Sequence, residues 1–453
     1  MKTAKRRSLA PAIVLLACLA TLAGAHDQIP APPQTEPIAI VNATIHTGNG
    51  PAIQSGVLLF ENGKITAVGN ALRIPADLKQ IDATGKHVYA GLFSARTAMG
   101  LVEIGAVRAT KDYDETGDIN PNVRAEQAFN PDSENIPVTR SNGILTVLSA
   151  PSGGLVSGHA AIMRMDGWTW EDMTVVPQAA LIVNWPKNRP TKSWSDTESI
   201  EEKKKKRAGR VAKIDDLITD ARAYWTAKDA AKKAKKAPPL MDRRLESMRG
   251  VIDGNTPVIV SADEVMDLRE AVAWALDRGL QLILFGGAQS DQCLDLLKDN
   301  DIPVILNNTN PEGWSTPVTR DSDYDALYKL PAKLHAAGIR FALTSTGSVG
   351  RVPHERSFPY EASMAAAFGL PADEALKAIT RYPAEILGVG DKLGTLENGK
   401  NATFFIANGD ILDIRTVVER AFIDGREIDL NDHHKMMYEK YREKYRQLGR
   451  IEE

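Results

Sequence analysis

The chain has 453 residues, of which 43% are hydrophobic and 25% are charged. These proportions are typical of a globular protein with a large core. The formal net charge is −3, and it becomes −7 if the first 25 residues, which hold four basic and no acidic groups, are removed. This balance excludes nucleic acid as an expected partner.

The first 25 residues have the pattern of a secretory signal peptide. Four basic residues precede an apolar run from Leu9 to Ala23, and the run ends in Ala23-Gly24-Ala25. A signal peptidase cuts after such a small-x-small pattern. We therefore expect export, with the bacterial periplasm as the destination. Cys18 follows Leu-Leu-Ala, which leaves a lipoprotein anchored through Cys18 as the alternative.

Both ends of the remaining chain are predicted to form β structure. Residues 26–37 are proline-rich and predict an extended leader, and residues 38–86 contain short strands with an Asn62-Gly63 hairpin turn. Short strands with the same kind of turn return over residues 389–430. The two segments together predict one small β-sandwich, and residues 431–453 predict a charged helical tail.

The middle of the chain, residues 87–388, alternates apolar strand-like runs with helical patterns. That order predicts a (β/α)8 barrel of the TIM type. The candidate strands are HVYAGLF, GILTVLSAP, AAIMRMD, AALIVNW, PVIVSA, LQLILFGG, IPVILNN and IRFALTST.

Residues 186–250 interrupt this alternation with nineteen Lys and Arg against ten Asp and Glu. Apolar residues at helical spacing from Val211 to Trp225 predict a helix packed on the barrel by one face. We interpret the run from Lys203 to Arg207 as a solvated surface and keep a patch for an anionic partner as the alternative.

One apolar strand ends in small and polar residues, as expected where a buried strand reaches a pocket. It runs from Tyr89 to Gly105 and reads YAGLFSARTAMGLVEIG. This stretch resembles the first barrel strand of the metal-dependent amidohydrolase superfamily, in particular imidazolonepropionase-like members. The phrases IDATGKHVYAGL, YPAEILG, LGTLENGK and AFIDGREI resemble the same family.

The resemblance implies hydrolysis of carbon-nitrogen bonds at zinc or a similar divalent metal. It places the family's metal-ligand and proton-shuttling positions at the ends of particular strands, and other residue types occupy those positions here. They are Arg96 and Ala98 after the first strand, Ser261 after the fifth, Gly286 after the sixth and Thr346 after the eighth, with Asn184 as the best match after the fourth. Alanine offers no lone pair and arginine stays protonated, so we expect no metal cofactor.

Other residues could carry chemistry at the same end of the barrel. The candidates are His159, in the loop PSGGLVSGH, His354, and the acidic Glu103 and Asp263. Histidines on separate loops are more often structural than catalytic.

Arg96 suggests a different use of the space that the metal occupies in the family. A guanidinium there would keep a positive charge, and it could hold Glu103, Asp263 or a small acidic ligand in a bidentate pair. We therefore expect a non-catalytic binding protein, acting as a homo-oligomer or as the partner of an active relative. An active hydrolase with a non-standard site is the alternative.

Overall fold

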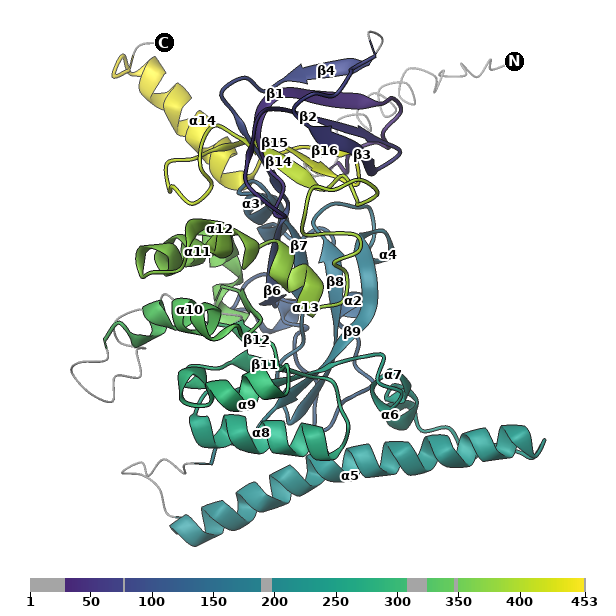
Figure 1. The fold of residues 1–453 in the computed structure, drawn as a ribbon. Helices are drawn as coiled ribbons and strands as arrows, with labels where there is room; N and C mark the ends of the chain where they lie inside the picture. The colour runs from purple at the N-terminus through teal and green to yellow at the C-terminus, as the bar shows by residue number, and fades with distance from the viewer. Residues whose placement is uncertain (1–28, 76–77, 189–197, 308–323, 346–348, 452–453) are drawn as a thin grey trace, which may run out of the picture.

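The computed structural model describes residues 29–75, 78–188, 198–307, 324–345 and 349–451. Two sheets dominate it: a nearly closed barrel in the middle of the molecule and a second sheet at one end, built from both ends of the chain (Figure 1). The predicted fold class is therefore confirmed. Cys18 and the proposed signal peptide lie outside the described residues.

The second sheet pairs strands that are far apart in the sequence. Its order is β16-β15-β14-β5-β1-β2-β3, and β4 pairs with β1. Asn62 and Gly63 both have positive φ, as a tight β2–β3 hairpin requires. The strands of this sheet are β1 (Ile38–His46), β2 (Ile53–Glu61), β3 (Lys64–Gly69), β4 (Lys79–Asp82), β5 (His87–Ala90), β14 (Phe404–Ala407), β15 (Val418–Ile423) and β16 (Arg426–Ile428).

The barrel sheet has eight strands in the order β13-β12-β11-β10-β9-β8-β7-β6. β8 runs antiparallel to both β7 and β9, and the other neighbours are parallel. The simple alternation of strand and helix therefore fails between β7 and β9, where hairpin-like connections replace long helices. The strands are β6 (Leu92–Thr97), β7 (Ile144–Ser149), β8 (Val156–Arg164), β9 (Thr174–Asn184), β10 (Val258–Ala262), β11 (Leu282–Gly286), β12 (Val304–Leu306) and β13 (Phe341–Leu343).

Helices cover the outside of the barrel, and alternate strand residues pack against them. The longer ones are α5 (Ile200–Lys233), α8 (Val265–Asp277), α10 (Ala326–Ala337), α11 (Phe358–Ala367) and α14 (His433–Gln447). The shorter ones are α2 (Ala125–Ala128), α3 (Asn135–Arg140), α4 (Trp170–Met173), α6 (Arg243–Glu246), α7 (Arg249–Ile252), α9 (Leu294–Asp299), α12 (Ala372–Lys377) and α13 (Arg381–Ile386). Short 3₁₀ turns are η2 (Arg108–Thr110), η3 (Ser290–Gln292) and η5 (Val349–Ser357).

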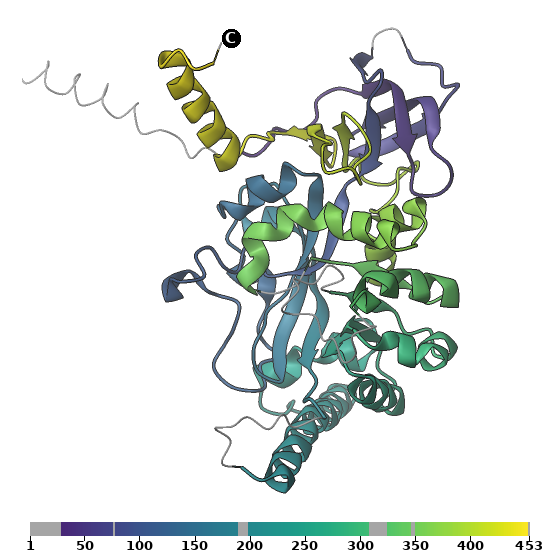
Figure 2. The same ribbon diagram turned by 90° about the vertical axis from the view of Figure 1, so that its left-hand side faces the viewer.

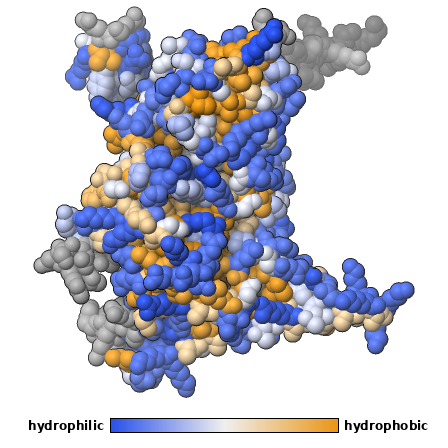
Figure 3. Space-filling model, viewed as in Figure 1, coloured by the Kyte–Doolittle hydropathy of each residue, from blue (hydrophilic) through white to orange (hydrophobic). Residues whose placement is uncertain are grey.

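The predicted basic excursion contains α5, which lies at the end of the molecule opposite the second sheet (Figure 1). Ser199 and Glu202 form a capping box that fixes its start. Its middle buries Ile214, Leu217, Ile218, Ala221 and Tyr224, while the end that projects from the body is mainly hydrophilic (Figure 3). Among the described residues, no helix has the length and apolar character needed to cross a bilayer.

A buried ion cluster joins the barrel to the second sheet. Asp166, just after β8, accepts a hydrogen bond from Arg140 at 2.8 Å and lies 3.4 Å from Arg426 on β16. Its second oxygen accepts the backbone N–H of Ala31 in the leader at 3.2 Å. One carboxylate thus connects four segments of the chain.

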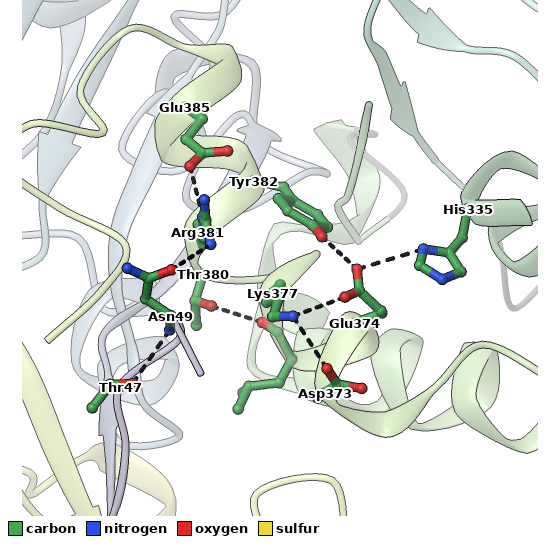
Figure 4. A network of polar contacts seen from close by, with 11 residues as sticks. Thr47, Asn49, His335, Asp373, Glu374, Lys377, Thr380, Arg381, Tyr382 and Glu385 are labelled. Carbon is green, nitrogen blue, oxygen red and sulfur yellow. Dashed lines mark hydrogen bonds and ion pairs between the residues drawn. The ribbon is translucent and has the colours of Figure 1, made fainter. Parts of the chain in front are cut away.

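A second polar network connects the last barrel helices to their surroundings (Figure 4). Glu374 of α12 contacts Lys377 at 2.8 Å and His335 of α10 at 3.5 Å. Arg381, at the start of α13, donates to Asn49 in the loop after β1 at 3.1 Å. These contacts fix the position of the second sheet on the barrel from the other side.

Candidate functional site

The barrel begins directly after β5 of the second sheet, because Gly91 alone separates β5 from β6. The predicted strand HVYAGLF is therefore two strands, of which only the second belongs to the barrel. The amino-terminal ends of the parallel strands face the second sheet, and their carboxyl ends face the opposite direction. Active sites in this fold lie at the carboxyl ends.

Arg96, near the carboxyl end of β6, reaches across the barrel. Its Nη1 donates to the Oγ of Ser261 on β10 at 2.9 Å, and its guanidinium lies 3.9 Å from the ring centre of Phe285 on β11. β6 and β10 are not neighbours in the sheet. Since only an inward-pointing side chain can join them, the guanidinium occupies the barrel interior, where it is only 6% exposed.

Ser261 connects Arg96 to a glycine-rich loop through a further hydrogen bond. Its hydroxyl donates to the Oδ1 of Asn184 on β9 at 3.3 Å. The amide nitrogen of Asn184 in turn donates to the carbonyls of Gly153 and Gly154, at 3.3 and 3.1 Å, and to the Oγ of Ser157 at 3.0 Å. Arg96, Ser261 and Asn184, predicted separately from three strands, thus form one chain of hydrogen bonds.

The charge of Arg96 has no acidic partner among the described residues. Burial lowers the pKa of its guanidinium to about 10, which still leaves it protonated at neutral pH. No carboxylate in the described part of the chain forms an ion pair with it. A buried cation is unfavourable unless an anion or several acceptors compensate it. Ser261 and the face of Phe285 supply only part of that compensation.

The expectation that Arg96 pairs with Glu103 or Asp263 is wrong. Glu103 lies in the loop after β6, where its carboxylate accepts hydrogen bonds from Asn130 at 3.4 Å and Asn135 at 3.5 Å. Burial raises the pKa of Glu103. Asp263 is exposed, and its Oδ1 accepts the N–H of Ala288 at 3.4 Å. Glu103 is thus held by Asn130 and Asn135, and Asp263 by the loop after β11.

Gly286 has a structural reason to be glycine. Its φ is +99°, and a Cβ added there would come within 2.5 Å of Asp263 Oδ1. A side chain at this position, histidine included, would therefore be strained by the positive φ, would lie close to the carbonyl oxygen of Ala262 and would require the carboxylate of Asp263 to move. Ala98 is buried in the main core at 2% exposure, and Thr346 lies outside the described residues.

The two candidate histidines lie away from the barrel interior. His159 pairs in register with Leu181, whose side chain belongs to the core outside the barrel, so its ring points outward. Its ring nitrogens make no hydrogen bond to the described residues that meets normal geometry, although the Ser247 backbone is nearby. Burial lowers the pKa of His159 to about 4. His354 is exposed on η5. The structure thus brings neither histidine to Arg96.

Glu355, which the sequence reasoning passed over beside His354, is the buried acid of this region. It is 1% exposed and accepts hydrogen bonds from Ser94 at 2.6 Å and Ser345 at 2.9 Å. Burial raises the pKa of Glu355, although Ser94, Ser345 and Thr97 oppose that shift. Its residue type gave no signal. The buried positions described in η5 are Val352 and Glu355, three residues apart, as the period of a 3₁₀ helix requires.

The described residues do not fit a divalent metal at the positions that the family resemblance assigns. Those positions present a guanidinium, a methyl group, a hydroxyl and a glycine. Within the described segments, no three His, Cys, Asp or Glu side chains gather as a metal site requires. A protonated arginine would also repel a cation placed beside it.

The comparisons with known proteins agree with this fold. A model of the amidohydrolase family matches residues 325–428. The amidohydrolase tasK of Hapsidospora irregularis is 23% identical over 435 residues, covering 86% of this chain and 43% of that protein. An N-acetylglucosamine-6-phosphate deacetylase of Caenorhabditis elegans is 31% identical over 111 residues, covering 23% of this chain and 24% of that protein. The chain spans less than half the length of each of these two relatives.

A solved structure matches the chain at the level of the fold. An amidohydrolase from Thermotoga maritima MSB8 superposes with a TM-score of 0.75 and 26% identity, covering 86% of this chain and 99% of that one. It accounts for both the barrel and the second sheet. The chain is thus similar to amidohydrolases in two ways: in sequence over residues 325–428 and in fold over most of its length.

Proposed function

We propose that this chain uses the amidohydrolase barrel to bind a small molecule that carries a carboxylate, through Arg96, instead of hydrolysing a substrate at a metal. The observation that carries the proposal is a buried guanidinium with no carboxylate partner among the described residues. A ligand carboxylate would supply the missing charge, and its desolvation inside the barrel would be offset by paired N–H donors.

The contacts around Arg96 support a prearranged site. Phe285 holds the plane of the guanidinium, and Ser261 uses one of its donors. An arginine has five N–H donors, so a fork remains for a bidentate carboxylate. The link through Asn184 to Gly153 and Gly154 connects this fork to the loop that would lie over a bound ligand.

Titration of the purified protein with succinate and N-acetylglycine tests this proposal. We expect binding by the wild type and at least a tenfold loss in Arg96→Met, which keeps the side-chain volume and removes the charge. Arg108→Met is the matched control, because Arg108 is exposed at the start of η2. Equal binding by wild type and Arg96→Met would contradict the proposal.

The second candidate function is hydrolysis of a carbon-nitrogen bond. Similarity to amidohydrolases favours it, and so does Glu355, a buried carboxyl group with a raised pKa next to the end of β13. Such a group can exchange a proton with a leaving amine. Metal content and an amidase panel, each measured with wild type and Glu355→Gln, distinguish the two candidates. About one metal ion per chain with Glu355-dependent turnover would favour the hydrolase.

We also propose a location and an assembly for the chain. It is exported, because its first 25 residues have the pattern of a signal peptide. It assembles with itself or with an active relative, because the scaffold phrases of the family are kept around altered ligand positions. Native mass spectrometry of the protein from its source measures the assembly. A monomer that captures no relative, or a protein that stays in the cytoplasmic fraction, would contradict the corresponding part.

A further inference from the structure

A second concave site lies at the amino-terminal side of the barrel, away from Arg96. It is a cavity of about 490 Å³ between the α3–β7 turn, the η5–α11 junction and the start of α14. α14 projects from the body beside the second sheet and buries none of its own side chains (Figure 2). The lining residues are Val138, Ser141, Asn142, Arg356, Ser357, Tyr360, Asp432, His434, Lys435 and Tyr438.

The charges in this cleft are unbalanced in favour of cations. Asp432 is the N-cap of α14 and faces Lys435 at 3.6 Å, so these two largely compensate each other. Arg356 has no carboxylate partner among the described residues. Its Nη1 lies 2.9 Å from Nδ1 of His434. Since a guanidinium can only donate, Nδ1 accepts and His434 is neutral in this arrangement.

The backbone of Arg356 is held in place, which favours a site over a mobile surface arginine. The amide of Asn142 donates to the Arg356 carbonyl at 2.6 Å. Its neighbour Glu355 is anchored in the interior by Ser94 and Ser345. The guanidinium therefore projects from a fixed point into a cleft that also offers hydroxyl groups and the rings of Tyr360 and Tyr438.

We infer that this cleft binds the oxyanion group of a small phosphate or sulfate ester. A tetrahedral oxyanion can accept from Arg356, whose charge has no carboxylate partner among the described residues, and from an N–H of Lys435 that the carbonyl of Leu430 does not use. The organic part would lie against the two tyrosine rings. This site does not depend on Arg96, so its failure would leave the proposed carboxylate site untouched.

Calorimetric titration with sulfate tests the inference. The variants are Arg356→Gln and, as the control with equal charge loss, Arg442→Gln. Arg442 lies on α14, pairs with Glu439 and does not line the cleft.

We expect saturable sulfate binding that weakens at least tenfold in Arg356→Gln and stays unchanged in Arg442→Gln. Equal binding by wild type and Arg356→Gln, or no saturable binding by either, would overturn the inference.

Discussion

Two buried arginines of this protein have opposite electrostatic surroundings. Arg140, 4% exposed at the joint between barrel and second sheet, faces the carboxylate of Asp166 at 2.8 Å. Arg96, 6% exposed in the barrel, faces a hydroxyl and an aromatic ring. Burial lowers the pKa of both guanidinium groups, but Asp166 opposes the shift only for Arg140. The charge of Arg140 is compensated by a carboxylate of the fold, and the charge of Arg96 has no such partner among the described residues. This contrast is the reason for proposing Arg96 as a binding group.

The largest expected effect is at Asp166. Asp166→Ala leaves Arg140 and Arg426 without their shared carboxylate, and breaking one partner of a buried ion cluster costs about 3–5 kcal/mol. Urea unfolding measures the loss. Asp413→Ala, which breaks an exposed pair with Arg415, is the control and should cost much less, because solvent screens an exposed pair. Similar losses in both variants would contradict the expected difference between the buried and the exposed pair.

The second-largest loss of stability is expected at Gly286. Gly286→Ala meets both an unfavourable φ and the carboxylate of Asp263, so we expect a loss of about 2–4 kcal/mol in thermal or urea unfolding. Gly254→Ala shares the positive φ, but no neighbouring atom lies within 4 Å of the added group. It should lose about 1 kcal/mol. A stable Gly286→His variant that gained bound zinc would reopen the position as a ligand site.

The free energy of unfolding is expected to depend on pH through His159. Its folded pKa, about 4, lies below the ordinary value of 6.5, so the unfolded chain binds more protons between those pH values. The contribution of neutral His159 is therefore complete above pH 6.5 and is lost as the pH falls to 4. We expect His159→Leu to flatten the decline of unfolding free energy over that window by about 1–3 kcal/mol. Parallel pH profiles for both proteins would contradict this account.

The smallest stability effect is expected at Arg96. Arg96→Met removes a buried charge that has no carboxylate partner, so stability should change by less than about 1 kcal/mol or increase. The same variant should lose binding of acidic ligands. A loss as large as that of Asp166→Ala would show that Arg96 is structural, and the two arginines would no longer differ.

The sequence predicted the barrel, the second sheet and the meeting of Arg96, Ser261 and Asn184 because these depend on strand ends, which a barrel collects at one rim. It could not predict the reversal of β8, since an apolar run has no direction of its own. It also singled out His354 where the neighbouring Glu355 is buried, because which side of a 3₁₀ turn faces inward is decided by packing. The sequence shows that Arg96 is charged. Only the three-dimensional structure shows that no carboxylate among the described residues pairs with it.

The second sheet also constrains how the protein is made. β5 lies between β1 and β14, and β14 begins at Phe404, more than three hundred residues later. During synthesis the strands from Ile38 to Ala90 must therefore wait with one edge unpaired until almost the whole chain has emerged. An open strand edge invites pairing with another molecule. We expect this interval, and not the closure of the barrel, to be the stage at which the nascent protein most needs a chaperone.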